Sequence, residues 1–283
     1  MMGHGNDHEG GTMTTGGDGA EIDLQLHRAH SARMYDYFLG GTTNFAPDRE
    51  AAGQAMAVFP WAGTAARANR AFMHRSTRVL AGTGIAQFLD IGTGIPTSPN
   101  LHEVAQGVNP RARVVYTDND PIVYAHAQAL LHSTEQGRTA YVQADVRDPE
   151  AILNSPMLHD TLDLTRPVAL SLVALLHFVP GSDDAHAVVD RLKRALPSGS
   201  ALVLSHGTRD FAPAETARVA QVYTAAGTAV QQRTREEIGR FFDGWRLLDP
   251  GLVATHRWRP DGDTDPTVTD AQISAYAAVA VKP

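Results

Sequence analysis

The chain has 283 residues, 43% of them hydrophobic, and a formal net charge of −7. This composition is typical of a globular protein with a sizeable core, and the charge argues against a nucleic-acid partner held by a basic face. The absence of cysteine excludes disulfides, thiolate metal sites and a cysteine nucleophile, and it suits a cytoplasmic protein. No apolar stretch reaches the length of a membrane helix, so we expect no membrane partner.

Residues 1–20 are rich in Gly, Thr and Asp, a composition that predicts a disordered tail. This segment has neither a basic start nor an apolar run, so it does not resemble a secretory signal. His4 and His8 could bind a metal ion, but two histidines in such a tail are weak support for a site. We therefore predict no metal site.

Residues 21–84 predict an N-terminal helical cap. Apolar residues recur at helical spacing through 22–41, starting with Leu24 and Leu26, and the pattern stops at Gly40 and Gly41. Two further helices are expected over 48–60 and 64–82, and no strand pattern appears before residue 85.

Residues 85–283 predict an α/β core domain, because short apolar runs alternate there with helical patterns. The predicted strands are 85–91, 113–118, 139–145, 167–176, 200–206, 245–251 and 273–283. The predicted helices of this part are 101–108, 121–133, 149–158, 183–196, 212–227 and one that begins at Thr234. The last two strands lie close enough in the chain to pair.

The stretch FLDIGTGIPTSPN at 88–100 follows the first of these strands. Gly92 and Gly94 allow a tight turn and a close approach of a ligand to the backbone. A dinucleotide fingerprint needs a third glycine, and Thr97 stands in its place. Asp90, ahead of the glycines, would repel a pyrophosphate but suits a ligand with an ammonium group, such as S-adenosylmethionine.

Two more aspartates end successive strands. Asp118 ends the second strand, where a carboxylate can accept hydrogen bonds from both ribose hydroxyls. Asp145 ends the third, where it can accept from an adenine amino group. An aspartate before a helix is usually only an N-cap, but three at successive strand ends favour an adenosyl ligand.

The chain resembles the class I S-adenosylmethionine-dependent methyltransferases, and specifically an actinobacterial S-adenosyl methyltransferase family formerly of unknown function. The similar segments are 32–41, 44–50, 68–75, 88–105, 114–127, 144–149, 171–180 and 249–253. The resemblance implies a Rossmann-like fold with a seven-stranded, mostly parallel sheet, an antiparallel C-terminal strand pair and a helical cap over the cofactor. Thr42 and Thr43 depart from the family pattern, which has a lysine there, and this departure removes support for a cation at that place.

The resemblance also implies a cofactor site and a lid. The expected cofactor-binding residues are Asp90, Gly92, Thr93, Gly94, Asp118, Asn119, Asp145, Val146 and Val173. The residues expected at the lid or substrate side are Tyr37, Gly40, Gly41, Asn44 and Arg70. The expected cofactor is S-adenosyl-L-methionine, with S-adenosyl-L-homocysteine as product.

His177 follows the fourth strand and is the candidate general base, although a buried histidine bonded to the backbone is the slightly favoured reading. The same loop lacks the Asn/Asp-Pro-Pro-aromatic tetrad of enzymes that methylate amino groups of bases or glutamine. This absence favours a small-molecule acceptor. Methyl transfer needs few side-chain catalysts, because the cofactor carries its own leaving group.

Two other groups of residues have a structural reading beside the functional one. The aromatic residues Tyr35, Tyr37, Phe38 and Phe45 could pack on the cofactor, but core packing is favoured. The basic strip Arg67, Arg70, Arg75 and Arg78 could hold an acceptor carboxylate, but a solvated helix face is favoured.

Two other functions stay open from the sequence. One is a non-catalytic S-adenosylmethionine-binding sensor or scaffold, and the other is an NAD(P)-dependent oxidoreductase, which Thr97 disfavours. The acceptor and the oligomeric state are not predicted.

Overall fold

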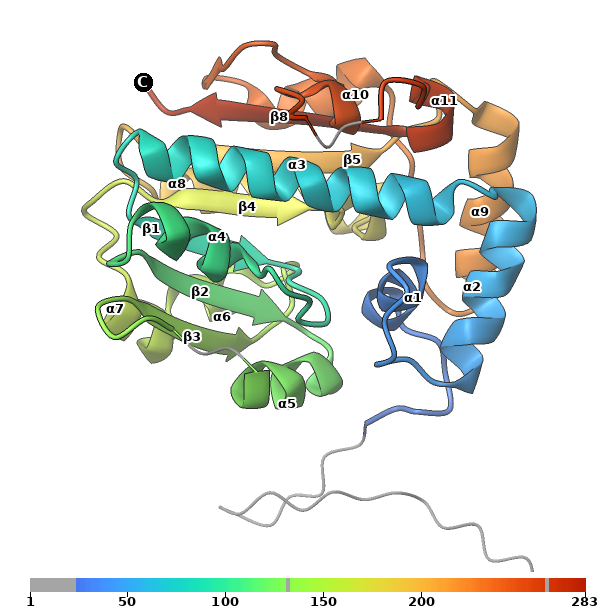
Figure 1. Cartoon of the computed structure of the whole chain (residues 1–283), viewed down its shortest axis with the longest axis horizontal. Helices are drawn as coiled ribbons and strands as arrows, with labels where there is room; N and C mark the ends of the chain where they lie inside the picture. The colour runs from blue at the N-terminus through green and yellow to red at the C-terminus, as the bar shows by residue number, and fades with distance from the viewer. Residues whose placement is uncertain (1–23, 131–132, 263–264) are drawn as a thin grey trace, which may run out of the picture.

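The computed structural model describes residues 24–130, 133–262 and 265–283, so His4, His8 and the predicted tail lie outside the described residues. The chain forms a sheet of order β3-β2-β1-β4-β5-β8-β6, in which β7 also pairs with β8 (Figure 1). The strands are β1 Gln87–Ile91, β2 Arg113–Asp118, β3 Arg138–Gln143, β4 Ala169–Val173, β5 Ala201–Gly207, β6 Arg246–Leu247, β7 Val253–Ala254 and β8 Ala275–Val281.

The sheet confirms the expected mixture of parallel and antiparallel strands. β1 to β5 pair in parallel, and β8 runs antiparallel to β5. β6 and β7 follow each other along the remaining edge of β8, where Leu247 pairs with Ala280 and Val253 pairs with Ala277. The eight strands therefore occupy seven positions, and β7 is the strand that the sequence did not predict.

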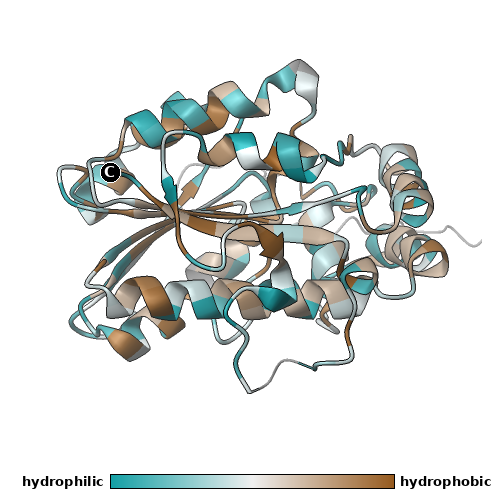
Figure 2. Ribbon diagram, turned by 90° about the horizontal axis from the view of Figure 1, so that it is seen from above, coloured by the Kyte–Doolittle hydropathy of each residue, from teal (hydrophilic) through white to brown (hydrophobic). Residues whose placement is uncertain are grey.

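Helices cover both faces of the sheet, as Figure 2 shows with the strands seen edge-on. The helices are α1 Ser31–Phe38, α2 Ala46–Val58, α3 Ala62–Gly82, α4 Leu101–Val108, α5 Pro121–Leu130, α6 Pro149–Leu153, α7 Pro156–Thr161, α8 Ala185–Arg194, α9 Pro213–Ala225, α10 Arg235–Gly239 and α11 Asp270–Ile273, with short 3₁₀ turns η1 Leu176–Phe178, η2 Gly181–Asp183, η3 Arg240–Phe242 and η4 Thr255–Arg257. Alternate strand residues face opposite cores: Phe88 packs on the side of α3 and α4, and Leu89 on the side of α8 and α10.

Helices α1, α2 and α9 gather beyond the carboxyl ends of the parallel strands (Figure 1). They share a small core that contains Met34, Ala51, Ala52 and Tyr223. Helix α3 instead runs along the sheet and packs against α4, β4, β5 and β8. The helices above the strand ends thus come from both halves of the chain.

Two helix predictions are corrected by the structure. The helix expected over 22–41 begins only at Ser31, because Leu24 and Leu26 turn away and pack with Ile95 and Ile122. The helix expected over 149–158 is two helices, α6 and α7, and Pro156 opens the second of them.

Capping boxes fix the starts of several helices. Asn100 and Glu103 cap α4, and Thr234 and Glu237 cap α10, the helix that was predicted to begin at Thr234. Thr269 and Gln272 cap α11 in the same way. Within the described residues, none of the helices has the length and apolar character needed to cross a membrane.

Candidate functional site

A cavity of about 560 Å³ opens at the carboxyl ends of the parallel strands, beside α1, α3 and α9. This volume is in the range of pockets that enclose small ligands, and the place is the usual ligand site of a parallel α/β sheet. The predicted residues that line it are Asp90, Gly92, Thr93, Gly94, Asp118, Asn119, Asp145, Val146, Val173, Arg70 and His177. All nine expected cofactor-binding residues therefore line one cavity, because the carboxyl ends of parallel strands lie at the same edge of the sheet.

The glycine turn after β1 is tied to β2. The backbone N–H of Gly92 donates to the Thr117 carbonyl at 2.7 Å, and that of Gly94 donates to Asp118 Oδ2 at 2.8 Å. Both glycines have positive φ angles, +75° and +68°. A Cβ on Gly92 would lie 2.6 Å from Leu175 Cδ1, so this position needs glycine for its conformation and its space.

The N-terminus of α4 is already occupied by a carboxylate of the chain. Glu103 accepts hydrogen bonds from the Asn100 backbone and from the Ser98 hydroxyl. Asn100 Oδ1 accepts the Thr97 N–H at 3.0 Å. In dinucleotide-binding proteins the pyrophosphate binds at this helix N-terminus. The capping contacts therefore argue against a dinucleotide, as does Thr97 in place of the third glycine.

Two buried carboxyls face the glycine turn. Burial raises the pKa of Asp90 to about 6, against the opposing effect of hydrogen bonds from Ser171 and Thr93. Burial likewise raises the pKa of Asp118, although the backbone N–H groups of Asp120 and Gly94 bond to its carboxylate. Two carboxyls whose ionised forms are poorly stabilised by the protein fit a ligand that brings its own positive charge.

Asp145 reaches the cavity with partners already in place. Arg147 Nε donates to Oδ1 at 2.9 Å, and Asn119 Nδ2 donates to Oδ2 at 3.1 Å. Burial alone would raise the pKa of Asp145, but the hydrogen bonds from Arg147 and Asn119 outweigh it and lower the pKa. Asp145 is therefore ionised, and its contact with an adenine amino group stays a prediction.

His177 lies on η1 at the cavity wall, with its ring 4.3 Å from the Phe178 ring. Burial, and then the charge of Arg233, lower its pKa to about 4, so the imidazole is neutral near pH 7. Nδ1 accepts the Gly207 N–H at 3.5 Å, which assigns the ring proton to Nε2. A ring of such low basicity, whose Nδ1 already accepts the Gly207 N–H, gives little support to the general-base hypothesis.

A hydrogen-bond network that the sequence did not predict holds the backbone around His177. Arg233 is 3% exposed and donates to the carbonyls of Leu176 and Val179, each at 2.9 Å. It also contacts His206 Nε2 at 2.9 Å. His206 stands at the end of the apolar run of β5, as Asp90, Asp118 and Asp145 stand at the ends of their strands. The same sequence pattern could therefore have identified His206.

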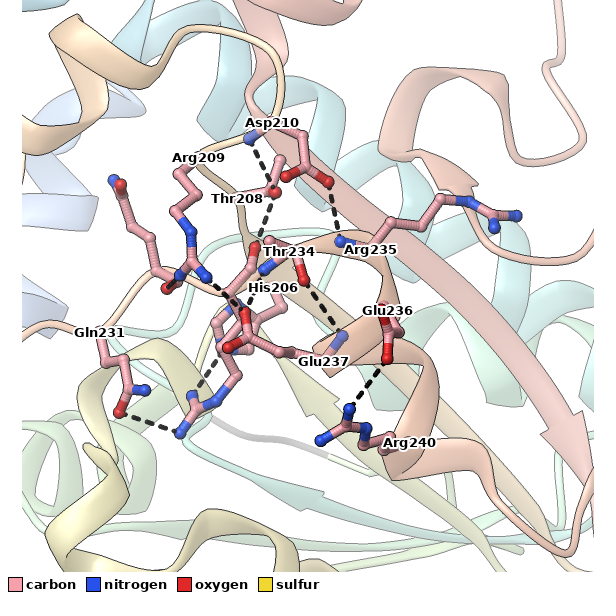
Figure 3. Close-up of polar contacts among 12 residues, drawn as sticks. His206, Thr208, Arg209, Asp210, Gln231, Thr234, Arg235, Glu236, Glu237 and Arg240 are labelled. Carbon is pink, nitrogen blue, oxygen red and sulfur yellow. Dashed lines mark hydrogen bonds and ion pairs between the residues drawn. The ribbon is translucent and has the colours of Figure 1, made fainter.

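Figure 3 shows the contacts around His206. In them, Thr234 Oγ1 caps the Glu237 N–H, and Asp210 Oδ2 accepts the Arg235 N–H at 2.8 Å. These contacts fix the start of α10 against the end of β5 and thereby hold the segment that carries Arg233.

A second missed network joins the cap to the cofactor residues. Arg33 is 1% exposed, and its Nε lies 3.3 Å from Asp120 Oδ2 while Nη1 lies 3.6 Å from Asp48 Oδ2. His30 Nδ1 lies 3.1 Å from the same Asp120 oxygen. The Asp120 N–H in turn donates to Asp118 Oδ1 at 3.0 Å. The only sequence signal was Arg33, a charged residue within the first predicted helix.

The structure places four expected lid residues away from the cavity wall: Tyr37, Gly40, Gly41 and Asn44. Asn44 Nδ2 donates to Asp36 Oδ2 at 2.8 Å and to the Gly41 carbonyl at 2.9 Å. A Cβ on Gly41 would collide with the Asp36 carboxylate. This turn is therefore closely packed against the end of α1. Among the aromatic residues singled out, Tyr35 and Phe38 line the cavity.

The basic strip of α3 binds the protein itself. Arg70 donates to the carbonyls of Thr97 and Pro99, which fixes the loop after the glycine turn. Arg75 is buried and donates to the carbonyls of Trp258 and Thr255. The expectation of a solvated face is wrong for Arg75.

The parallel sheet with its antiparallel last strand, and a cavity bounded by a glycine turn and acidic strand ends, define a class I Rossmann-like methyltransferase. The chain belongs to the S-adenosyl methyltransferase family, whose model matches residues 18–283. Its cofactor is S-adenosylmethionine, and the buried carboxyl of Asp90 beside the glycine turn fits the positive charge of the ammonium group of that molecule.

Solved structures agree with this assignment. A DUF574 family protein from Streptomyces avermitilis is 52% identical, with a TM-score of 0.90 over 92% of this chain and 100% of that chain. A putative methyltransferase from Thermobifida fusca is 41% identical, with a TM-score of 0.85 over 92% of this chain and 97% of that chain. The plantazolicin methyltransferase BamL is 10% identical, with a TM-score of 0.50 over 89% and 95% of the chains, and shares the fold. Among curated proteins, none matches this chain significantly.

Proposed function

We propose that the chain transfers the methyl group of S-adenosylmethionine to a small-molecule acceptor in the cytoplasm. The observation that carries this proposal is the extent of the cavity. It continues from the cofactor residues to Tyr35 on α1, Phe59 directly after α2, and Tyr223 on α9, beyond the strand ends. The net charge of −7 supports an acceptor other than nucleic acid.

The bound cofactor supplies an electrophilic methyl group on a sulfonium. Gly92 and Gly94 let the amino-acid end approach the backbone, where Asp90 can accept the ammonium group. Asp118 is placed to accept the ribose hydroxyls, and Val146 lines the cavity beside Asp145. The neutral His177 adds no positive charge near the strand end where the methyl group is expected, so it does not oppose the sulfonium.

The test uses S-adenosylmethionine labelled in its methyl group, incubated with the protein and a cell extract. We expect label in the small-molecule fraction, and its loss with the Asp118→Ala variant. Label in the protein or nucleic-acid fraction would contradict a small-molecule acceptor. Binding of S-adenosylhomocysteine without transfer to any fraction would favour a sensor or scaffold, and binding of NADH would favour an oxidoreductase.

A further inference from the structure

The half of the cavity beyond the cofactor residues differs from the cofactor half in its chemistry. Its walls include Tyr35, Phe59, Asn69, Phe178, Ser205 and Tyr223, contributed by α1, α2–α3, η1, β5 and α9. Four of these six are aromatic, and the Phe178 and Tyr223 rings lie 5.5 Å apart. We call these six residues the acceptor half.

No side chain of the acceptor half carries a charge near neutral pH. Burial raises the pKa of Tyr35 and of Tyr223, so both hydroxyls keep their protons. The neighbouring His177 is neutral. The charged side chains of the lining belong to the strand ends, the segment before α1, α3 and η2: Arg28, Arg70, Asp90, Asp118, Asp145, Arg147 and Asp183. An ionic acceptor would find no counter-charge among these six residues. Arg70, whose charge reaches Tyr35, already donates to the carbonyls of Thr97 and Pro99.

Hydrogen bonds fix the orientation of the Asn69 amide. Tyr35 donates its hydroxyl proton to the Ala66 carbonyl at 3.0 Å, so its oxygen can only accept from Asn69. The atom that faces Tyr35, at 3.0 Å, is therefore the donor Nδ2. Oδ1 then faces Ser205, whose hydroxyl donates to it at 2.5 Å.

This orientation leaves one donor for a ligand. Nδ2 carries two hydrogens, and Tyr35 takes one of them. Within the described residues, the other has no hydrogen-bond acceptor, although Asn69 is 5% exposed and lines the cavity. A buried donor without a partner is unfavourable, so a ligand oxygen is a fitting partner for it.

We propose that the acceptor half binds a neutral aromatic molecule, with one oxygen accepting a hydrogen bond from Asn69 Nδ2. This inference rests on the proposed function and names the substrate class. The aromatic walls supply stacking and edge contacts to a planar ring, and the neutral surroundings favour an uncharged acceptor. Asn69 selects molecules that have an oxygen at the right place on the ring.

The experiment measures binding to the protein saturated with S-adenosylhomocysteine, by calorimetry at pH 7. The probes are 2-naphthol, its anionic analogue 2-naphthoate, its cationic analogue 2-naphthylmethylammonium, and 2-methylnaphthalene, in which a methyl group replaces the hydroxyl. We expect 2-naphthol to bind roughly tenfold more tightly than each of the other three. 2-Methylnaphthalene leaves the Asn69 donor without a partner, and the two ionic probes bury a charge. Tightest binding of an ionic probe, equal binding of 2-naphthol and 2-methylnaphthalene, or no binding of 2-naphthol would overturn the proposal.

The Asn69→Ala variant makes the same test from the protein side. We expect its affinity for 2-naphthol to fall roughly tenfold, with an unchanged affinity for 2-methylnaphthalene and for S-adenosylhomocysteine. Asn154→Ala, at an exposed amide directly after α6 that does not line the cavity, is the matched control and should change none of these affinities. An equal loss for both neutral probes would contradict the role of Asn69. Failure of the wild-type chain to bind S-adenosylhomocysteine would instead contradict the proposed function itself.

Discussion

Two buried arginines hold opposite ends of the cavity, and they do so with different partners. Arg33 lies between the carboxylates of Asp48 and Asp120 and joins the cap to the cofactor end. Arg233 lies behind His177 and bonds to two carbonyls and a neutral imidazole. No carboxylate forms an ion pair with Arg233 within the part of the chain that the structure describes.

The difference follows from what each end has to bind. At the cofactor end, charges are paired within the protein or left for a charged ligand, as with Asp90. At the other end, Arg233 hydrogen-bonds only neutral groups, although the charge of Glu237 also acts on it. Burial, and after it the charge of Arg233, lowers the pKa of His177. Burial is also the main reason that the pKa of His206 is low, with smaller effects from His177 and Arg233. A carboxylate beside Arg233 would offset its charge and favour protonation of both histidines.

The largest effect is expected for Arg33→Met. The change leaves Asp48 and Asp120 buried without their cation, which costs about 3–5 kcal/mol in the free energy of unfolding. Urea unfolding measures this loss, and Arg218→Met on the exposed face of α9 is the control. A loss no greater than that of the control would show that the ion pairs of the cap contribute little.

The Asp90→Asn change should stabilise the protein while it weakens cofactor binding. The pKa of Asp90 is about 6 in the folded chain and near 3.8 when unfolded, so folding stability falls as pH rises from about 4 to about 6. Asparagine removes this cost, which is roughly 3 kcal/mol above pH 6. Unfolding at pH 7.5 and pH 5 should show a gain that is smaller at the lower pH, and calorimetry should show weaker binding of S-adenosylmethionine. A variant that is less stable at pH 7.5 would contradict the assignment.

The Arg233→Met change should cost less than Arg33→Met. It leaves the carbonyls of Leu176 and Val179 without their donor, but it also removes a buried cation that has no carboxylate in direct contact within the described residues, so we expect a loss of about 1–3 kcal/mol. The pKa of His177 should rise toward its ordinary value, because Arg233 lowers it. Urea unfolding and an NMR titration of the imidazole measure the two effects. An unchanged His177 pKa would show that burial alone sets it.

The sheet and the residues at its strand ends that line the cavity could be predicted because their signals are local. An apolar run that ends in an aspartate is visible within a few residues, and β2 has the predicted bounds. The carboxyl ends of parallel strands then share one edge, so Asp90, Asp118 and Asp145 meet without any further information.

The supporting networks and the acceptor half could not be predicted in this way. Arg233 bonds to residues more than fifty positions earlier in the chain, and Asn69 bonds to Ser205 across 136 positions. Such pairs depend on how helices pack at the strand ends, and α9 shows no pattern that marks it as part of the cap. The glycine pair at 40–41 shows the opposite case, a local signal with a packing explanation. The two glycines favoured a lid, whereas the structure explains Gly41 by the close approach of the Asp36 carboxylate.

The smallest effect on stability near neutral pH is expected for His177→Gln. This variant tests whether the end of the cavity beside Arg233 keeps its histidine neutral. The imidazole accepts one long hydrogen bond from Gly207, and a glutamine amide can accept it instead, so the stability at pH 7.5 should change by less than about 1 kcal/mol. The pKa of His177 is about 4 in the folded chain and near 6.5 when unfolded, so the unfolded chain binds more protons between these values. The wild type therefore loses stability as pH falls from about 6.5 to about 4, and the variant should lose less over the same range. Urea unfolding at pH 7.5, 5.5 and 4.5 measures both slopes. Equal slopes would mean that His177 titrates normally and that Arg233 leaves this end of the cavity open to a charged imidazole.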